Sequence, residues 1–343
     1  MKSKRYIFIV ILLISLFSLI LISTTLGTVK IPIKNVLKII LYKLSIDIDI
    51  SNIKASDIFI VTNIRLPRII LASLVGAILS LVGTSYQAIF KNPMADPYVM
   101  GASSGAAFGA TLAISLGIGS GLLGFGVTNL FAFIGAMITT VIVYNLAKVG
   151  SKISTTSILL AGIVMTAFLS SIISLMMIFN HEELGKIVTW TMGSFNGANW
   201  NQIILITIPV LIGLIVILSF SKEMNAFVLG EENAQSLGVN IELMKKTILV
   251  ISSFLAACAV SVSGIIGFVG LIVPHLFRLI FGSNHKILLP VSVLGGAIFL
   301  LICDTLARTI LDGIEIPVGI ITSIFGGPFF LYLLKRSKKN KLI

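Results

Sequence analysis

Residues 65–110 read RLPRIILASLVGAILSLVGTSYQAIFKNPMADPYVMGASSGAAFGA, and this stretch decides the fold. From Ile69 to Val82 it carries no charge, so this part can cross hydrocarbon as a helix while the arginines before it face water. The segment KNPMADP then ends the helix, because proline lacks a backbone donor. The glycines after it recur every four residues, which gives a smooth face for another helix. They are Gly101, Gly105 and Gly109.

The composition indicates a membrane protein. Of the 343 residues, 57% are hydrophobic and 11% are charged, and the mean hydropathy is +1.09. These values exclude an ordinary soluble globular chain. A net charge of +12 would suit nucleic-acid binding in a soluble protein, but in a membrane chain it indicates basic cytoplasmic loops. We therefore expect an all-α integral membrane protein that contacts the lipid bilayer and binds no nucleic acid.

About ten apolar segments are predicted to be transmembrane helices within a single domain, residues 1–343. The third and the eighth are too short to cross about 30 Å of hydrocarbon unaided, so protein or a water-filled cavity must surround them. The eighth is expected to start at Pro274. The predicted spans are 6–26, 58–83, 97–112, 123–147, 156–179, 202–220, 244–265, 273–282, 286–309 and 316–335.

The predicted orientation rests on the ends of the chain. An even number of spans places both termini on one side, and the basic ends MKSKR and KRSKKNK indicate that this side is the cytoplasm. The first apolar segment lacks a small-x-small cleavage site, which favours a retained span over a signal peptide. Residues 28–57 then form a lysine-rich external loop with a short interfacial helix.

The two halves of the chain share a pattern. A long span leads into a short span interrupted by glycine or proline at 69–112 and again at 247–282. Under the predicted topology the two copies run in opposite directions, which is typical of the inverted repeats of transporters.

Patterns for catalysis and metal binding are missing from the sequence. No G-x-x-x-x-G-K-[ST] phosphate loop is present, so we expect no enzyme activity and no cofactor on this chain. The histidines share no ligand spacing and predict no metal site. The cysteines lie in apolar runs and fit small core residues. These residues are His181, His275, His285, Cys258 and Cys303.

Asp304 is the only acidic residue deep within a predicted span. Arg308 lies four residues later on the same helix face, which predicts an ion pair between them. An ion-driven secondary transporter usually has more intramembrane carboxylates, so this class is a distant alternative.

Together these features resemble the FecCD/BtuC-type permease subunits of ABC importers for iron-siderophore complexes, haem or cobalamin. The resemblance rests on RLPR, Gly83, Gln87, KNPMADP and the glycine-rich segment, and it covers about residues 57–335. It implies a type II ABC importer permease fold with inverted-repeat halves in a bacterial cytoplasmic membrane. The expected cargo is an iron-siderophore complex, with cobalamin or haem as the alternative.

The resemblance also implies partner proteins. They are a second permease subunit, identical or a paralogue, two ATPase subunits that bind ATP and Mg, and an extracellular or periplasmic substrate-binding protein. VLGEENAQSLGVN, within 225–240, resembles the cytoplasmic coupling helices that dock on the ATPase, although an amphipathic loop on the membrane surface would look similar. The matched coupling positions are Gly230, Ala234, Leu237 and Gly238.

Two further sets of residues are assigned by the same resemblance. Three arginines at the external ends of spans match those that meet acidic residues of the binding protein, since a guanidinium can hold a carboxylate with two hydrogen bonds. The alternative is that they anchor helix ends at the lipid headgroups. These arginines are Arg65, Arg68 and Arg308.

The resemblance also assigns residues to the translocation path between two permease subunits and to its gate. They are Gly101, Gly105, Asn92, Met94, Thr155 and Thr156. The alternative for the Asn and Thr side chains is that they serve as helix caps.

Overall fold

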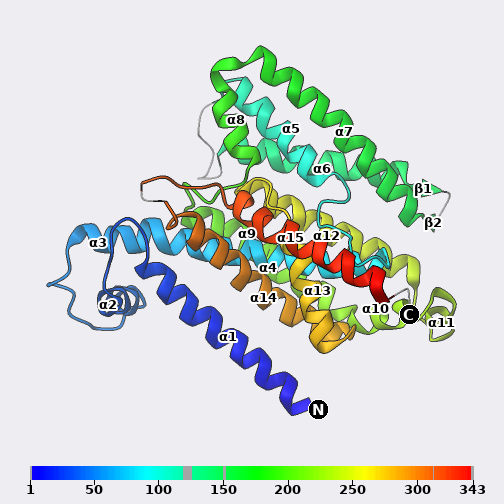
Figure 1. The fold of residues 1–343 in the computed structure, drawn as a ribbon, viewed down its shortest axis with the longest axis horizontal. Helices are drawn as coiled ribbons and strands as arrows, with labels where there is room; N and C mark the ends of the chain where they lie inside the picture. Colours follow the sequence, from blue (N-terminus) through cyan, green and yellow to red (C-terminus); the bar gives the residue numbers. More distant parts are fainter. Residues whose placement is uncertain (1, 119–125, 150–151, 312, 341–343) are drawn as a thin grey trace.

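Helix α4 (Leu66–Ile89) runs through the centre of a helical bundle in the computed structural model of the protein (Figure 1). Together with α3 (Ala55–Phe59) and the π-helical turn η1 (Ile60–Arg65), α4 forms one continuous apolar helix. In the most apolar 18-residue segment of this continuous helix, 89% of the residues are buried. The structure describes residues 2–118, 126–149, 152–311 and 313–340. The other long helices surround α4.

Helices make up nearly all of the regular structure in the described residues. Two strands of two residues each, β1 and β2, pair antiparallel. The remaining elements are α1 (Lys2–Thr25), α2 (Ile33–Lys43), α5 (Ala102–Ser115), α6 (Val127–Leu146), β1 (Lys148–Val149), β2 (Lys152–Ile153), α7 (Thr155–Phe179), η3 (His181–Glu183), α8 (Leu184–Thr191), α9 (Trp200–Ser219), α10 (Ser221–Val228), α11 (Glu231–Ser236), α12 (Ile241–Ser263), α13 (Val269–Phe281), α14 (His285–Ala307) and α15 (Val318–Asn340).

Each of the ten predicted spans coincides with a helix. Seven helices among the described residues are long and apolar enough to cross a membrane. α5 has 14 residues and α13 has 13, so the prediction that the third and eighth spans are short is confirmed. The seven long spans are Ile7–Thr25, Ala55–Ile89, Val127–Leu146, Thr155–Phe179, Trp200–Ser219, Ile241–Ser263 and His285–Ala307.

The eighth span starts earlier than predicted. α13 begins at Val269, so the prediction that Pro274 starts it is wrong. A proline inside a helix leaves the carbonyl four residues earlier without its donor. Here that carbonyl belongs to Gly270, and the side-chain amide of Gln87 on α4 donates to it at 3.2 Å. A hydrogen bond from α4 therefore replaces the one that the proline removes.

Small residues let the helices approach closely at two crossings. α4 meets α14 at Gly76 and Gly296, where a Cβ on Gly76 would lie 2.2 Å from the carbonyl oxygen of Gly296. α5 meets α6 at Gly105 and Gly135, where a Cβ on Gly105 would lie 2.4 Å from the opposing carbonyl oxygen. The second crossing confirms that the four-residue spacing of glycines provides a close helix contact.

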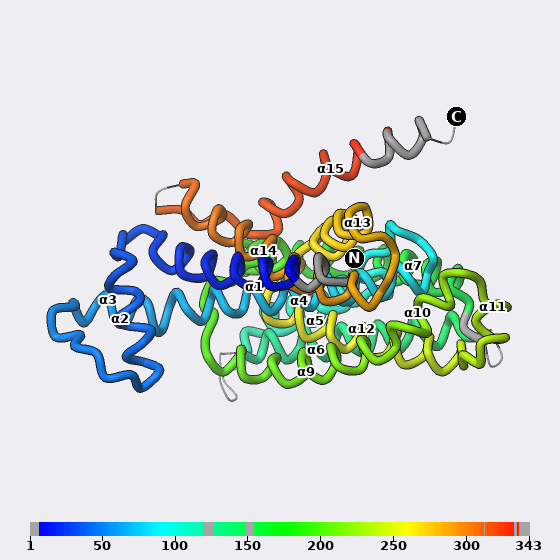
Figure 2. Tube along the Cα trace, turned by 90° about the horizontal axis from the view of Figure 1, so that it is seen from below, coloured from blue at the N-terminus to red at the C-terminus, as the bar shows by residue number. Residues whose placement is uncertain are grey.

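The packing reflects the inverted repeat. α4 packs along α14 and α13, and α12 packs in the corresponding way along α6 and α5. Figures 1 and 2 show that α1 starts on the side of the bundle that carries α10 and α11 and runs toward α2, whereas α15 runs toward the side with α10 and α11. The start of α1 and the end of α15 therefore lie on one side, as an even number of spans requires. Below, the side with α2 and α3 is the arginine end and the opposite side is the coupling end.

The crossing of α4 and α14 gives a stability prediction. Gly76→Ala should lower the free energy of unfolding by about 1–3 kcal/mol, because the new methyl group overlaps backbone atoms of α14. The measurement is thermal unfolding of the detergent-solubilised chain. Gly185→Ala is the matched control, since Gly185 lies in α8 with nothing within 4 Å of an added Cβ. Equal melting temperatures for the two variants would contradict the assigned contact.

Candidate functional site

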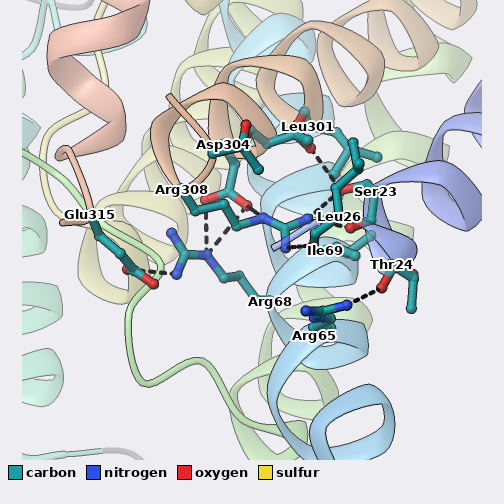
Figure 3. Close-up of polar contacts among 12 residues, drawn as sticks. Ser23, Thr24, Leu26, Arg65, Arg68, Ile69, Leu301, Asp304, Arg308 and Glu315 are labelled. Atoms are coloured by element: carbon teal, nitrogen blue, oxygen red, sulfur yellow. Dashed lines mark hydrogen bonds and ion pairs between the residues drawn. The ribbon is translucent and has the colours of Figure 1, made fainter. Parts of the chain in front are cut away.

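Three arginines and one carboxylate form a buried cluster at the arginine end of the bundle (Figure 3). The cluster joins the end of α1, the start of α4 and the end of α14. Each of the four side chains belongs to a residue that is at most 8% exposed. Its members are Arg65, Arg68, Arg308 and Asp304.

Asp304 lies between two guanidinium groups. Arg68 Nε donates to its two carboxylate oxygens at 3.0 and 3.3 Å. Arg308 Nε lies 3.7 Å from Oδ2, so the predicted ion pair between residues 304 and 308 is confirmed. A fully buried carboxylate is tolerated when it is paired and hydrogen-bonded, and Asp304 satisfies both conditions.

Arg65 and Arg308 also cap the C-terminal end of α1. Arg308 Nη1 donates to the carbonyl of Leu26 at 2.8 Å, and its Nη2 donates to that of Ser23 at 2.6 Å. Arg65 Nη1 donates to the carbonyl of Thr24 at 2.8 Å. The last carbonyls of a helix lack partners within it and carry partial negative charge. The two arginines supply these partners and fix α1 to the bundle.

Glu315 completes the cluster, and the sequence analysis did not identify it. Its Oε2 accepts a hydrogen bond from Arg68 Nη1 at 2.7 Å, while its side chain remains 47% exposed. The same carboxylate and the three arginines line a pocket of about 320 Å³. The only sequence signal for Glu315 was its place in the short segment between the last two spans, which does not reveal a contact with residue 68.

The cluster determines what the three arginines do within the chain. Their guanidinium groups bind α1, Asp304 and Glu315, and in this way they anchor helix ends. Docking of a binding protein on them is not tested by these contacts and stays a prediction.

At the coupling end, α10 and α11 form the two short helices that the glycine spacing predicted. Gly230 (φ +131°) precedes α11 and Gly238 (φ +79°) follows it, and both φ values favour glycine. Ala234 is fully buried, whereas Leu237 is 72% exposed. Two further exposed apolar residues lie at the end of α10: its last residue, Val228, and Leu229, which follows it. We name the exposed set Val228, Leu229 and Leu237 the coupling edge.

Contacts with neighbouring segments fix the coupling edge to the bundle. Lys245 Nζ of α12 lies 2.9 Å from Glu231 Oε1 of α11. Lys91, in the segment after α4, places its ammonium 4.4 Å from the centre of the Phe227 ring of α10. The segments on both sides of the coupling edge are therefore in contact with α12 and with the residues that follow α4.

The predicted gate residues occupy local turns near the coupling end. Asn92 Oδ1 accepts the backbone N–H of Met94 at 2.9 Å, and Met94 is 45% exposed. Ser154, not a threonine, caps α7 with its side chain. Thr155 and Thr156 are the first two residues of α7, and Thr156 is exposed. Their role in a gate stays a prediction.

The two path glycines are buried within the chain. Gly101 (φ +77°) precedes α5, and Gly105 lies against α6. The face that they form is thus covered by a helix of the same chain, and their place in a path between two subunits stays a prediction.

Cys258 and Cys303 are both buried and unpaired, as core residues are expected to be. Within the described ranges, no group of three or more His, Cys, Asp or Glu side chains could hold a metal ion.

Comparison with known proteins identifies the family. A model of the FecCD transport family matches residues 11–336. The chain belongs to the FecCD transport family. This FecCD permease is 43% identical to the cobalamin import system permease protein BtuC of Halobacterium salinarum over 276 residues, which are 80% of this chain and 73% of that protein. It is 40% identical to the hemin transport system permease protein HmuU of Yersinia pestis over 281 residues, 81% of this chain and 84% of that protein.

A solved structure gives the same result for the fold. It is described as a metal-chelate type ABC transporter in an inward-facing conformation, and the TM-score is 0.81 at 33% sequence identity. The match covers 96% of this chain and 99% of that chain. The FecCD permease thus has the type II importer permease fold and is an integral-membrane permease of an ABC importer.

The buried cluster of this FecCD permease gives a second stability prediction. Asp304→Asn should lower the free energy of unfolding by about 3–5 kcal/mol, because two buried guanidinium groups then lose their shared carboxylate. Thermal unfolding in detergent measures the change. Glu183→Gln is the control: it removes an ion pair with the exposed Lys186, and such pairs contribute at most about 1 kcal/mol. A similar loss in both variants would refute the cluster's role.

Proposed function

We propose that the chain is the permease subunit of an ATP-driven importer that carries an iron-siderophore complex into the bacterial cytoplasm. It works in a pair, as two identical copies or with a paralogue, together with two ATPase subunits and an external substrate-binding protein. ATP and Mg bind to the ATPase subunits, and this chain binds no cofactor. The observation that carries the proposal is the coupling edge.

The coupling edge has the properties of a docking surface. Leu229 and Leu237 are each 72% exposed at an end of the bundle, and exposed apolar groups in such positions favour a protein partner. The ion pair from Lys245 and the contact from Lys91 link the edge to α12 and α4. A partner that pushes on the edge would therefore tilt two of the central helices.

The proposed orientation of the chain in the membrane follows from the cytoplasmic location of the ATPase subunits. If the ATPase subunits dock at the coupling end, that end faces the cytoplasm, and both termini lie there. The basic sequences MKSKR and KRSKKNK at the two ends of the chain support this orientation. The arginine end then faces the exterior, where a binding protein would arrive.

The cargo is proposed from the chemistry of the relatives. The names of the two relatives and of the solved structure described above refer to cobalamin, to hemin and to metal chelates, all of which carry the metal inside an organic ligand. Such a cargo needs no metal ligands from the permease. An iron-siderophore complex has the same property, and cobalamin and hemin are the alternatives that the two named relatives favour.

In the proposed mechanism, closure of the ATPase subunits pushes the coupling edge and tilts α4 and α12. The path between the two permease subunits then opens in turn to the docked binding protein and to the cytoplasm.

Leu237→Glu tests the coupling edge. The new carboxylate should reduce co-purification of the ATPase subunit by about tenfold or more, because even about 1.4 kcal/mol of lost binding has that effect. Leu116→Glu is the matched control, since Leu116 is 59% exposed but follows α5 at the arginine end.

The same variants also test the transport function. Uptake of radiolabelled ferric siderophore, hemin and cobalamin is measured in cells with and without the chain. One cargo should depend on the wild-type chain and be lost in Leu237→Glu but not in Leu116→Glu. Uptake that persists after ATP depletion would instead support an ion-driven carrier.

Glu315→Gln tests docking at the arginine end. Glu315 is the half-exposed carboxylate beside Arg68, so its neutralisation should strengthen the binding of an acidic binding protein several-fold, mainly through faster association. Surface plasmon resonance with the purified binding protein measures this, and the gain should shrink at high salt. Glu182→Gln, an exposed carboxylate in η3, is the control. Equal affinities for both variants would contradict docking on this cluster.

A further inference from the structure

Helix α2 has no part in the proposed transport mechanism. Figure 1 shows it end-on beside the terminus of α1, and Figure 2 shows it running across the direction of α1. It packs against α1 and η1 at the arginine end of the bundle. If α1 crosses the bilayer, α2 therefore lies roughly parallel to the membrane plane, close to where the span ends.

One face of α2 is fixed to the bundle. Val36 and Ile39 are at most 1% exposed, and they belong to a small apolar cluster that includes Val61 of η1 and Leu66 of α4. The helix is thus anchored through this face, and its remaining faces are available to other contacts.

A second face is apolar and exposed. Successive residues of a helix are rotated by 100°, which places Ile33, Leu37 and Leu44 on one stripe beside the buried face. These residues are 50%, 37% and 67% exposed, respectively. The end of α1 against which α2 packs also carries exposed apolar residues, Ile22 and Leu26, which are 48% and 40% exposed.

A basic face borders the apolar stripe. Lys34 and Lys38 lie on it, and Lys30 precedes the helix. Lys34 is exposed. Lys38 donates to the backbone carbonyl of Asp49 at 3.2 Å, which uses one of its three donors.

We propose that α2 is an interfacial helix that binds anionic phospholipid headgroups of the bilayer in which the chain sits. The apolar stripe enters the boundary of the acyl chains, and the lysines contact headgroup phosphates. A helix with this division of faces, lying in the membrane plane, has the geometry that binds lipid surfaces. Each lysine near an anionic surface adds about fivefold to the affinity.

The neighbouring helix α1 favours lipid over an acidic protein as the occupant. An acidic protein would pair with the lysines, but it would also have to cover an apolar stripe beside α1, a candidate membrane span whose most apolar segment is only 11% buried within the chain. Lipid can contact both faces at once, because its acyl chains cover the apolar stripe while its headgroup phosphates pair with the lysines. Binding of a protein to this helix is therefore an outcome that the test must distinguish.

The experiment places a fluorescent label on α2 of the full chain in nanodiscs. In one variant, Leu37→Cys, the label lies on the apolar stripe, and in the other, Ser51→Cys, it lies in the exposed turn before α3. The native Cys258 and Cys303 are buried, so the label reacts with the introduced cysteine. Lipids with a quencher attached to the acyl chain report contact with the bilayer. Phosphatidylglycerol is titrated into phosphatidylcholine to measure the charge dependence.

The label at residue 37 should be quenched by these lipids and the label at residue 51 should not. Quenching at residue 37 should increase with phosphatidylglycerol, and Lys34→Glu should weaken the apparent affinity for this lipid at least about fivefold. Lys54→Glu, the same charge change on an exposed lysine outside α2, should have no effect.

Three results would overturn the proposal. The first is equal quenching of the labels at residues 37 and 51, and the second is a dependence on phosphatidylglycerol that is unchanged in Lys34→Glu. Protection of residue 37 only after a substrate-binding protein is added would assign the face to that protein.

Discussion

The buried carboxylate of Asp304 is the interaction on which the arginine end of the bundle depends. Two arginines from different helices share it, and one of them, Arg308, also binds the last carbonyls of α1. A charge inside a membrane protein is costly unless it is paired, and unpaired backbone carbonyls are costly as well. The cluster meets both requirements with the same side chains, so α1, α4 and α14 are joined at one point.

The central position of α4 follows from the small residues along it. Gly76 lets the backbone of α14 approach, and Gly83 does the same for α13, where a Cβ would lie 2.0 Å from the carbonyl oxygen of Gly270. The same helix carries Arg68 at one end and leads to Lys91 at the other. A single buried helix therefore connects the arginine end to the coupling end, which is the connection that a transporter driven from one side needs.

Much of the fold was predictable because the signals are local. The length of the apolar segments predicted the ten helices. The spacing of glycines predicted the contact of α5 with α6 and the break between α10 and α11. The ion pair between Asp304 and Arg308 was predictable because both residues lie on one helix turn. The partners of Arg68 and Arg65 were not, since Glu315 is distant in sequence and the α1 carbonyls are backbone atoms that no residue type marks. Pro274 misled the prediction for α13, because the donor that compensates it comes from another helix.

The bond from Gln87 to Gly270 makes one helix dependent on a residue of another. Gln87 Nε2 donates at 3.2 Å to the carbonyl that Pro274 leaves without its helical donor, and at 3.5 Å to the carbonyl of Leu271. Replacing Gln87 with an apolar residue would leave the Gly270 carbonyl inside the bundle without this donor. The first turns of α13 are thus stabilised by a residue of another helix, and Pro274 cannot be understood from α13 alone.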